Sequence, residues 1–180
     1  GYINYVKNQG ADPNNPYADK PTKAEDLTYF LEYQFYHMYV RYFLWNFVGR
    51  EGDRQESRWE SGLEWNDLLR YTPEKSQNKG KNLYYFLPLF LGSLGVGWHA
   101  ISKKQDAAVI GMLFFFTGIA IVLYLNQWPY QPRERDYSYA GSFQTFAIWV
   151  GLGVLFLHDL IRQRFKQFAP WIAGGLVMIA

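Results

Sequence analysis

Between two apolar runs the chain reads Tyr124-Leu-Asn-Gln-Trp-Pro-Tyr-Gln-Pro-Arg-Glu-Arg-Asp-Tyr-Ser-Tyr-Ala-Gly-Ser142. Four consecutive charged residues, Arg133 to Asp136, lie near its centre, whereas the flanking runs 107–125 and 143–157 carry no formal charge. Ionisable clusters at the edge of a membrane are costly and usually mark a pathway or a site. The pattern therefore predicts a functional loop at a membrane surface. The alternative is that the four charges pair with one another and anchor the loop among the lipid head groups.

The average composition of the 180 residues hides two regions. Of the 34 Lys, Arg, Asp and Glu residues, 23 lie in residues 1–82 and only 11 in residues 83–180. Aromatic residues make up 20% of the chain, including 7 Trp and 15 Tyr, which suits wide membrane–water interfaces. A net charge of +2 without a basic stripe argues against nucleic acid as a partner. We expect an all-α membrane protein that forms part of a longer polypeptide.

The composition also limits the metal chemistry. The chain has no cysteine, so disulfides and thiolate metal sites are excluded. Its histidines, His37, His99 and His158, are far apart in sequence and lack partners at ligand spacing, so we expect no zinc or haem site.

Residues 1–82 are predicted to be extracytoplasmic loops that contain one helix, over 27–48. That segment is long enough to span a membrane and holds ten aromatic residues, yet it also contains Glu32, His37 and Arg41. Ionisable groups at the bilayer centre cost about 2.5–3.5 kcal/mol each. We therefore predict an amphipathic interfacial helix or one packed against a larger bundle, with a conventional span as the weaker alternative.

Residues 83–180 are predicted to form the transmembrane region. Three apolar segments have the length of a span and a fourth is truncated: 83–101, 107–125, 143–160 and 170–180. Pro88 is expected to kink the first span. Gly92, Gly95 and Gly97 resemble a dinucleotide loop by spacing only, and inside an apolar helix they favour close approach of another helix.

The positions of Lys and Arg residues predict the orientation. Lys103 and Lys104 lie in the short loop after the first span, and Arg162, Arg164 and Lys166 follow the third. The positive-inside rule places both groups in the cytoplasm. The loop around residues 133–136 and residues 49–82 then share the extracytoplasmic side.

Five segments together resemble a known family: Trp45-Asn-Phe-Val-Gly-Arg50, Tyr84-Tyr-Phe-Leu-Pro-Leu-Phe-Leu-Gly92, Tyr124-Leu-Asn-Gln127, Gln131-Pro-Arg-Glu-Arg-Asp-Tyr-Ser-Tyr-Ala-Gly-Ser-Phe143 and Ala147-Ile-Trp-Val-Gly-Leu-Gly153. The family consists of large polytopic bacterial membrane proteins described as protein O-mannosyltransferase-like. The resemblance covers roughly residues 27–165 and corresponds to a later part of the family's membrane domain. It implies a GT-C type architecture in the bacterial inner membrane, in which a helical bundle takes a sugar from a polyprenyl-phosphate carrier on the extracytoplasmic face. The acidic first loop that carries catalysis in GT-C enzymes has no counterpart here.

This chemistry needs positive charge on the departing phosphate. Arginine supplies it because its planar guanidinium holds two phosphate oxygens at once and stays charged near lipid. Arg133 and Arg135 are therefore the candidates for binding the carrier phosphate. Pro129 and Pro132 place them at the outer end of a span, and Tyr137 is expected to help position the loop.

Glu134 and Asp136 are the weaker candidates for a catalytic base or for a ligand of a divalent metal ion. An Arg on each side would lower a carboxylate's pKa and weaken it as a base, so we expect these acids mainly to hold the arginines. The alternative function belongs to another class: a non-catalytic structural subunit of a larger membrane complex. In either case the expected partners are membrane lipid, other membrane subunits or the remainder of the same polypeptide.

Overall fold

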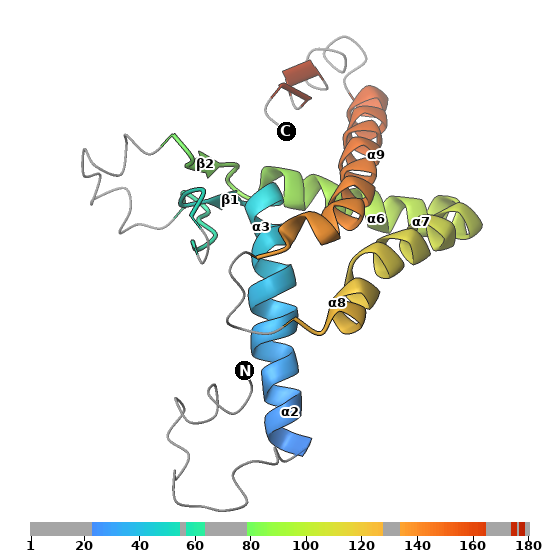
Figure 1. Ribbon diagram of the computed structural model, residues 1–180. Helices are drawn as coiled ribbons and strands as arrows, with labels where there is room; N and C mark the ends of the chain where they lie inside the picture. The colour runs from blue at the N-terminus through green and yellow to red at the C-terminus, as the bar shows by residue number, and fades with distance from the viewer. Residues whose placement is uncertain are drawn as a thin grey trace, which may run out of the picture.

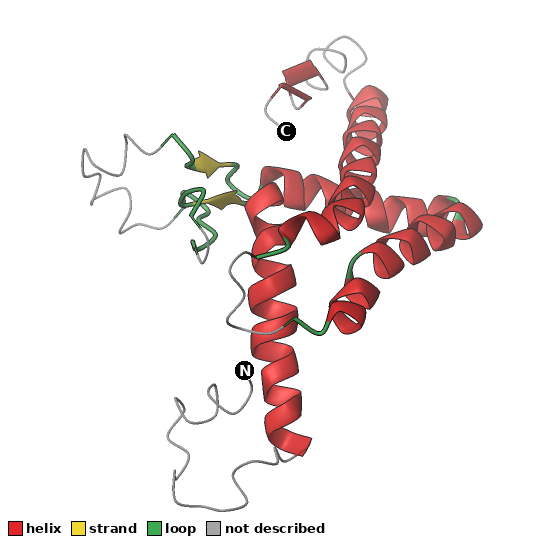
Figure 2. Cartoon of the chain, in the orientation of Figure 1, coloured by secondary structure: helices red, strands yellow, loops and turns green. Residues whose placement is uncertain are grey.

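The computed structural model describes residues 23–54, 57–63, 79–127, 134–164, 174–175 and 177–178. In this part of the chain almost all regular structure is helical, and one sheet of two short strands lies beside the helices (Figure 2). The elements are α2 (Lys23–Tyr29), η1 (Phe30–Val40), α3 (Arg41–Phe47), β1 (Gly49–Arg50), β2 (Asn82–Leu83), α6 (Leu87–Ser102), α7 (Lys104–Thr117), α8 (Ile119–Leu125), η2 (Asp136–Tyr139) and α9 (Ala140–Arg164).

The first three elements form one continuous helix over residues 23–47, here called the N-terminal helix (Figure 1). Its middle, η1, is a π-helix, whose i→i+5 hydrogen bonds widen the turn. Rings along it stack in sequence: Phe35 on Tyr39 and Tyr39 on Phe43, with centroids 6.0 and 6.4 Å apart. The helix differs from the amphipathic pattern expected for residues 27–48, because the polar side chains of Gln34 and Arg41 are buried. Its buried side therefore needs polar partners.

The two strands form an antiparallel pair in which Gly49 lies opposite Leu83 and Arg50 opposite Asn82. Gly49 has a φ of 136°, and a Cβ there would lie 2.5 Å from the backbone oxygens of Asn82 and Glu60. Only glycine fits this position. The sheet thereby fixes the end of the N-terminal helix next to the start of α6.

The sheet also shortens the first predicted span. Residues 82 and 83 belong to β2, and Tyr85 and Phe86 have positive φ, so α6 begins only at Leu87. Its 16 residues are fewer than the about 20 that cross a bilayer. The prediction that Pro88 kinks this helix is wrong, because Pro88 lies in the first turn, where proline removes no intrahelical hydrogen bond.

Helices α6 and α9 cross and pack closely (Figure 1). Their contact is made by glycines on both sides: a Cβ on Gly95 would meet the carbonyl oxygen of Trp149, and one on Gly153 would meet that of Leu91. Gly92 faces the ring of Phe146 in the same contact, whereas Gly97 has open space around it. Two of the three glycines singled out in the sequence therefore allow a close helix–helix approach.

Two helical stretches among the described residues are long and apolar enough to cross a membrane, by length and composition. One is Lys104–Leu125, with 22 residues, and the other is Asp136–Arg162, with 27. The first is broken into α7 and α8 at Gly118, whose φ of −118° and ψ of −89° are not helical. A Cβ on this glycine would also meet the hydroxyl of Tyr39. The predicted partial span 170–180 is described only at residues 174–175 and 177–178, which are helical. Three or four spans are therefore not shown, because α6 is short and the last segment lies mostly outside the described residues.

Aromatic clusters join the N-terminal helix to the later helices. One contains Tyr39, Val122 and Tyr139, and the other contains Phe47, Phe146 and Trp149. The ring of Phe47 lies 4.6 Å from that of Phe146, edge to face, a favourable arrangement for aromatic pairs. The N-terminal helix is thus packed against α8, η2 and α9.

Candidate functional site

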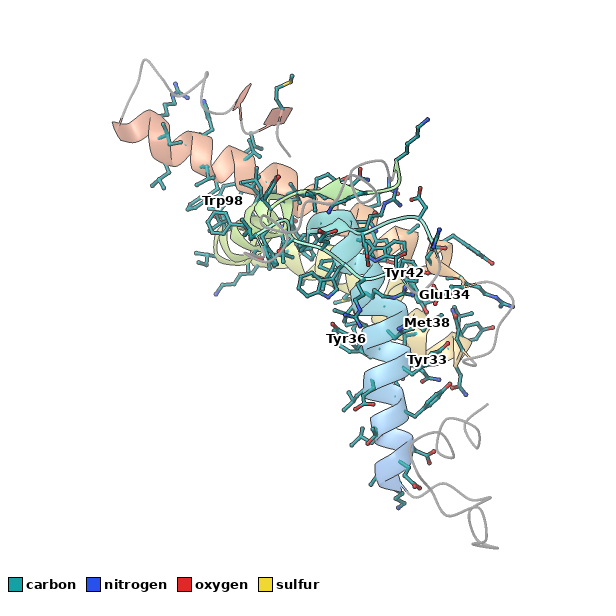
Figure 3. All side chains as sticks on the ribbon, turned by 90° about the vertical axis from the view of Figure 1, so that its left-hand side faces the viewer. Tyr33, Tyr36, Met38, Tyr42, Trp98 and Glu134 are labelled. Atoms are coloured by element: carbon teal, nitrogen blue, oxygen red, sulfur yellow. The ribbon has the colours of Figure 1, made fainter. Side chains whose placement is uncertain are left out.

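Glu134 lies just before η2, and its carboxylate meets three side chains of the N-terminal helix (Figure 3). Arg41 Nη2 donates to Oε2 at 2.7 Å, and the Tyr42 hydroxyl donates to the same oxygen. His37 Nε2 lies 3.3 Å from Oε1. These four residues are called the Glu134 cluster below. The side chains of Arg41 and Glu134 are only 5% and 11% exposed, so this ion pair is largely shielded from water.

Every nitrogen of the Arg41 guanidinium has a partner. Besides Nη2, its Nε donates to the carbonyl oxygen of His37 at 2.9 Å, and Nη1 donates to that of Ser57 at 3.1 Å. The guanidinium carbon also lies 4.5 Å from the ring centre of Tyr42 and 5.3 Å from that of Trp45, which are cation–π distances. Arg41 therefore joins the N-terminal helix, the segment at Ser57 and the charged loop.

The surroundings of Glu134 decide its protonation state. Burial by itself would raise the pKa of this carboxyl group. Hydrogen bonds from His37, Tyr42 and Arg41, together with the positive charge of Arg41, outweigh burial and lower the pKa from 4.5 to about 2. Glu134 is therefore ionised at neutral pH, and its oxygens are occupied by donors.

Three further hydrogen bonds fix both ends of the loop along the N-terminal helix. They run from Tyr29 Oη to the carbonyl oxygen of Gln127 at 2.9 Å, from Gln34 Nε2 to Asn126 Oδ1, and from Tyr39 Oη to Ser142 Oγ at 3.2 Å. Asn126 ends α8 in the left-handed conformation, with a φ of 41°, which asparagine tolerates better than most residues. The segments on either side of residues 128–133 are thus both bound to one rigid element.

A cavity of about 410 Å³ lies beside the Glu134 cluster and shares Tyr42 with it. Residues from the N-terminal helix, both strands, η2 and α9 line it: Tyr42, Trp45, Asn46, Arg50, Asn82, Tyr84, Asp136, Tyr137, Ala140 and Phe143. Its volume is within the range of about 300–1,000 Å³ that is usual for small-molecule sites. The lining combines five aromatic rings with two amides and one charge of each sign.

The loop residues singled out in the sequence have different positions. Arg135 is exposed, and within the described residues it forms no ion pair with Glu134 or Asp136. Asp136 and Tyr137 line the cavity. Pro129, Pro132 and Arg133 lie outside the described residues.

The expectation that Glu134 holds the neighbouring arginines of the loop differs from the contacts seen. Glu134 binds Arg41, which is 93 positions earlier in the chain. A buried guanidinium needs a carboxylate, and Glu134 supplies it directly.

Sequence reasoning missed the partners of Glu134 and, apart from Asp136 and Tyr137, the residues that line the cavity. One signal was present: Arg41 lies in an aromatic segment, and a charge there requires an opposite charge. The contributions of Arg50, Asn82 and Tyr84 had no such signal, because they depend on the pairing of two strands of two residues each.

The described residues offer no ready metal centre. They include no group of three or more His, Cys, Asp or Glu side chains that could hold a metal ion. The carboxylate of Glu134 already accepts hydrogen bonds, and of the two loop acids only Asp136 lines the cavity.

Comparison with known proteins returns no significant match: no protein-family model, no curated protein and no solved structure.

Proposed function

We propose that the chain is part of an integral membrane glycosyltransferase that takes a sugar from a polyprenyl-phosphate carrier at the extracytoplasmic face of the bacterial inner membrane. The observation that carries this proposal is the placement of the loop. Arg135 lies between two helices that are apolar enough to span a membrane, and Asp136 and Tyr137, at the start of the second helix, line a cavity. A lipid-linked sugar needs this combination: lipid beside the helices, a cation at the level of the head groups and an enclosed polar site next to it.

The exposure of the first apolar helix supports the membrane setting. Only 11% of the apolar window of Lys104–Leu125 is buried, against 33% for Asp136–Arg162. A core helix of a water-soluble protein is mostly covered by its own chain, whereas large side chains such as Val109, Met112 and Phe116 are exposed here. Lipid acyl chains would cover this face.

Glu134 and Asp136 have different roles in this proposal. Glu134 has a pKa of about 2 and accepts hydrogen bonds from three side chains, so it is a weak base that fixes the loop. Asp136 lines the cavity and is the better candidate for the base or for a metal ligand. Arg135, with Arg133, supplies the positive charge for the carrier phosphate.

Binding of sugar-free polyprenyl phosphate to the chain in lipid nanodiscs tests the proposal. Arg135→Lys keeps the charge but loses the two-point hold on phosphate, so affinity should fall about tenfold, which is one charge-assisted hydrogen bond of about 1.5 kcal/mol. Arg58→Lys, also at an exposed arginine, is the matched control and should bind like wild type. Equal affinity of wild type and Arg135→Lys would remove Arg135 from the site, and no binding by wild type would contradict the proposal as a whole.

A structural subunit of a larger membrane complex is the second candidate, and the same exposed face favours it. Helices of a partner would then cover Val109, Met112 and Phe116 in place of lipid. Under this function wild type binds no polyprenyl phosphate, and it runs as a larger complex in mild detergent.

A further inference from the structure

We propose that the cavity beside the Glu134 cluster binds the sugar ring of the donor, a neutral hexopyranose, while the phosphate lies outside the cavity at Arg135. This inference rests on the proposed function for the lipid-phosphate part of the ligand. The sugar part rests on the lining of the cavity itself.

The aromatic residues supply surfaces for a pyranose. A sugar ring has faces rich in C–H groups, which carry a slight positive charge and pack on the negatively charged face of an aromatic ring. Tyr84, directly after β2, and Tyr137 of η2 line the cavity, and Tyr137 is 64% exposed, so its ring is available to a ligand. Trp45 lines it from the N-terminal helix.

The polar residues suit hydroxyl groups. Asn46 and Asn82 each carry an amide, which both donates and accepts, as a hydroxyl does. Asn46 Nδ2 already donates to the carbonyl oxygen of Tyr42 at 2.8 Å, which fixes its orientation. Its oxygen is then an acceptor held in place by the helix.

The balance of charge favours a neutral ligand inside the cavity. Arg50 and Asp136 are the only formal charges in the lining, and they have opposite signs. Arg50 also pairs with Asp53 at 2.8 Å and donates to the carbonyl oxygen of Gly80 at 2.9 Å, so its charge is already compensated. A phosphate would gain little there. Arg135 is exposed and adjacent to Asp136 in the chain, which places a free cation next to the cavity rather than in it.

Two carriers separate the sugar from the phosphate in the experiment: polyprenyl phosphate and polyprenyl-phosphate mannose, each titrated against the chain in nanodiscs. Wild type should bind the mannose-bearing carrier about tenfold more tightly, the preference that a few well-placed contacts provide. Tyr137→Ala and Asn82→Ala should each reduce this preference to less than twofold, and Asn82→Ala should leave binding of the sugar-free carrier unchanged. Tyr85→Ala is the matched control, since Tyr85 is 56% exposed and lies outside the lining, and it should keep the preference.

Two other results of these titrations would overturn the sugar site. Equal affinity of wild type for the two carriers overturns the sugar site and leaves the proposed function standing. An equal loss of both affinities in Tyr137→Ala, with unchanged thermal unfolding, assigns this residue to the phosphate and overturns the inference.

If wild type binds neither carrier, the proposed function fails. Binding of methyl α-mannoside, measured by saturation transfer, then tests the cavity as a sugar site on its own. Saturation transfer from the protein to its ring protons, lost in Tyr137→Ala, supports a sugar site, whereas no transfer in wild type overturns it.

Discussion

The pair formed by Arg41 and Glu134 shows how one residue can determine the place of a whole loop. A guanidinium that is 5% exposed cannot stay unpaired, and the carboxylate that neutralises it belongs to the segment predicted to bind the carrier. In the part of the loop that the structure describes, Arg41 rather than Arg135 holds Glu134 in place. Arg135 stays available for a ligand because another arginine occupies the acid beside it.

Glu134→Gln should destabilise the fold by about 3–5 kcal/mol at pH 7, because it leaves the buried charge of Arg41 uncompensated. This loss of unfolding free energy depends on pH. The pKa of Glu134 is lowered from 4.5 to about 2, so its contribution is fully present above pH 4.5 and disappears as pH falls through about 2. Chemical unfolding in detergent at pH 7, 4.5, 3 and 2 should therefore show a difference between wild type and variant that is largest at pH 7 and shrinks below 4.5.

A double variant, Arg41→Met with Glu134→Leu, is the control for this prediction. Apolar side chains of similar volume often replace a buried pair at little cost, so it should be more stable than Glu134→Gln at pH 7. The assignment is wrong if the wild-type advantage is the same at pH 7 and pH 2.

At the scale of elements, the crossing of α6 and α9 depends on two glycines that touch the opposite backbone. Gly95→Ala and Gly153→Ala each place a methyl group against a carbonyl oxygen, of Trp149 and Leu91 respectively. Overpacking of this kind costs about 1–3 kcal/mol, and we expect a lower unfolding temperature for both.

Each helix also supplies a matched control, because a Cβ on Gly97 of α6 or Gly151 of α9 meets nothing within 4 Å. Alanine at either control position should leave the unfolding temperature unchanged or raise it, since glycine inside a helix costs about 0.5–1 kcal/mol relative to alanine. Equal effects at all four positions would show that the contact is not tight.

The elements also show what the sequence can and cannot predict. The apolar runs predicted the two long helices, and the glycines of the first run predicted the close helix–helix contact at Gly95. Both features depend on residues that are near one another in the sequence. The start of α6 was placed four residues too early: residue 83 belongs to a strand whose partner lies more than thirty residues before it, and a single sequence does not reveal that pairing. Arg41 and Glu134 were each recognised as unusual, but only the structure joins them.

For the whole molecule, the orientation in the membrane stays a prediction from the loop charges. Ser102 precedes the candidate span Lys104–Leu125 and Ser138 follows it, so a crossing would place them on opposite sides. The chain has no cysteine, so Ser102→Cys and Ser138→Cys each introduce a single thiol. A membrane-impermeant maleimide added to intact cells should label the thiol at position 138 and not the one at 102. The reverse labelling would invert the topology, and equal labelling would argue against a crossing.

The distance in sequence between Arg41 and Glu134 has a consequence for how the protein is made. A ribosome adds Arg41 93 residues before it adds Glu134, whose carboxylate neutralises it. The ring partners of that helix, Phe143 and Phe146, come later still. During translation the helix therefore carries an unpaired charge that disfavours entry into lipid. The N-terminal helix can therefore complete its native contacts only after the start of α9 has been made.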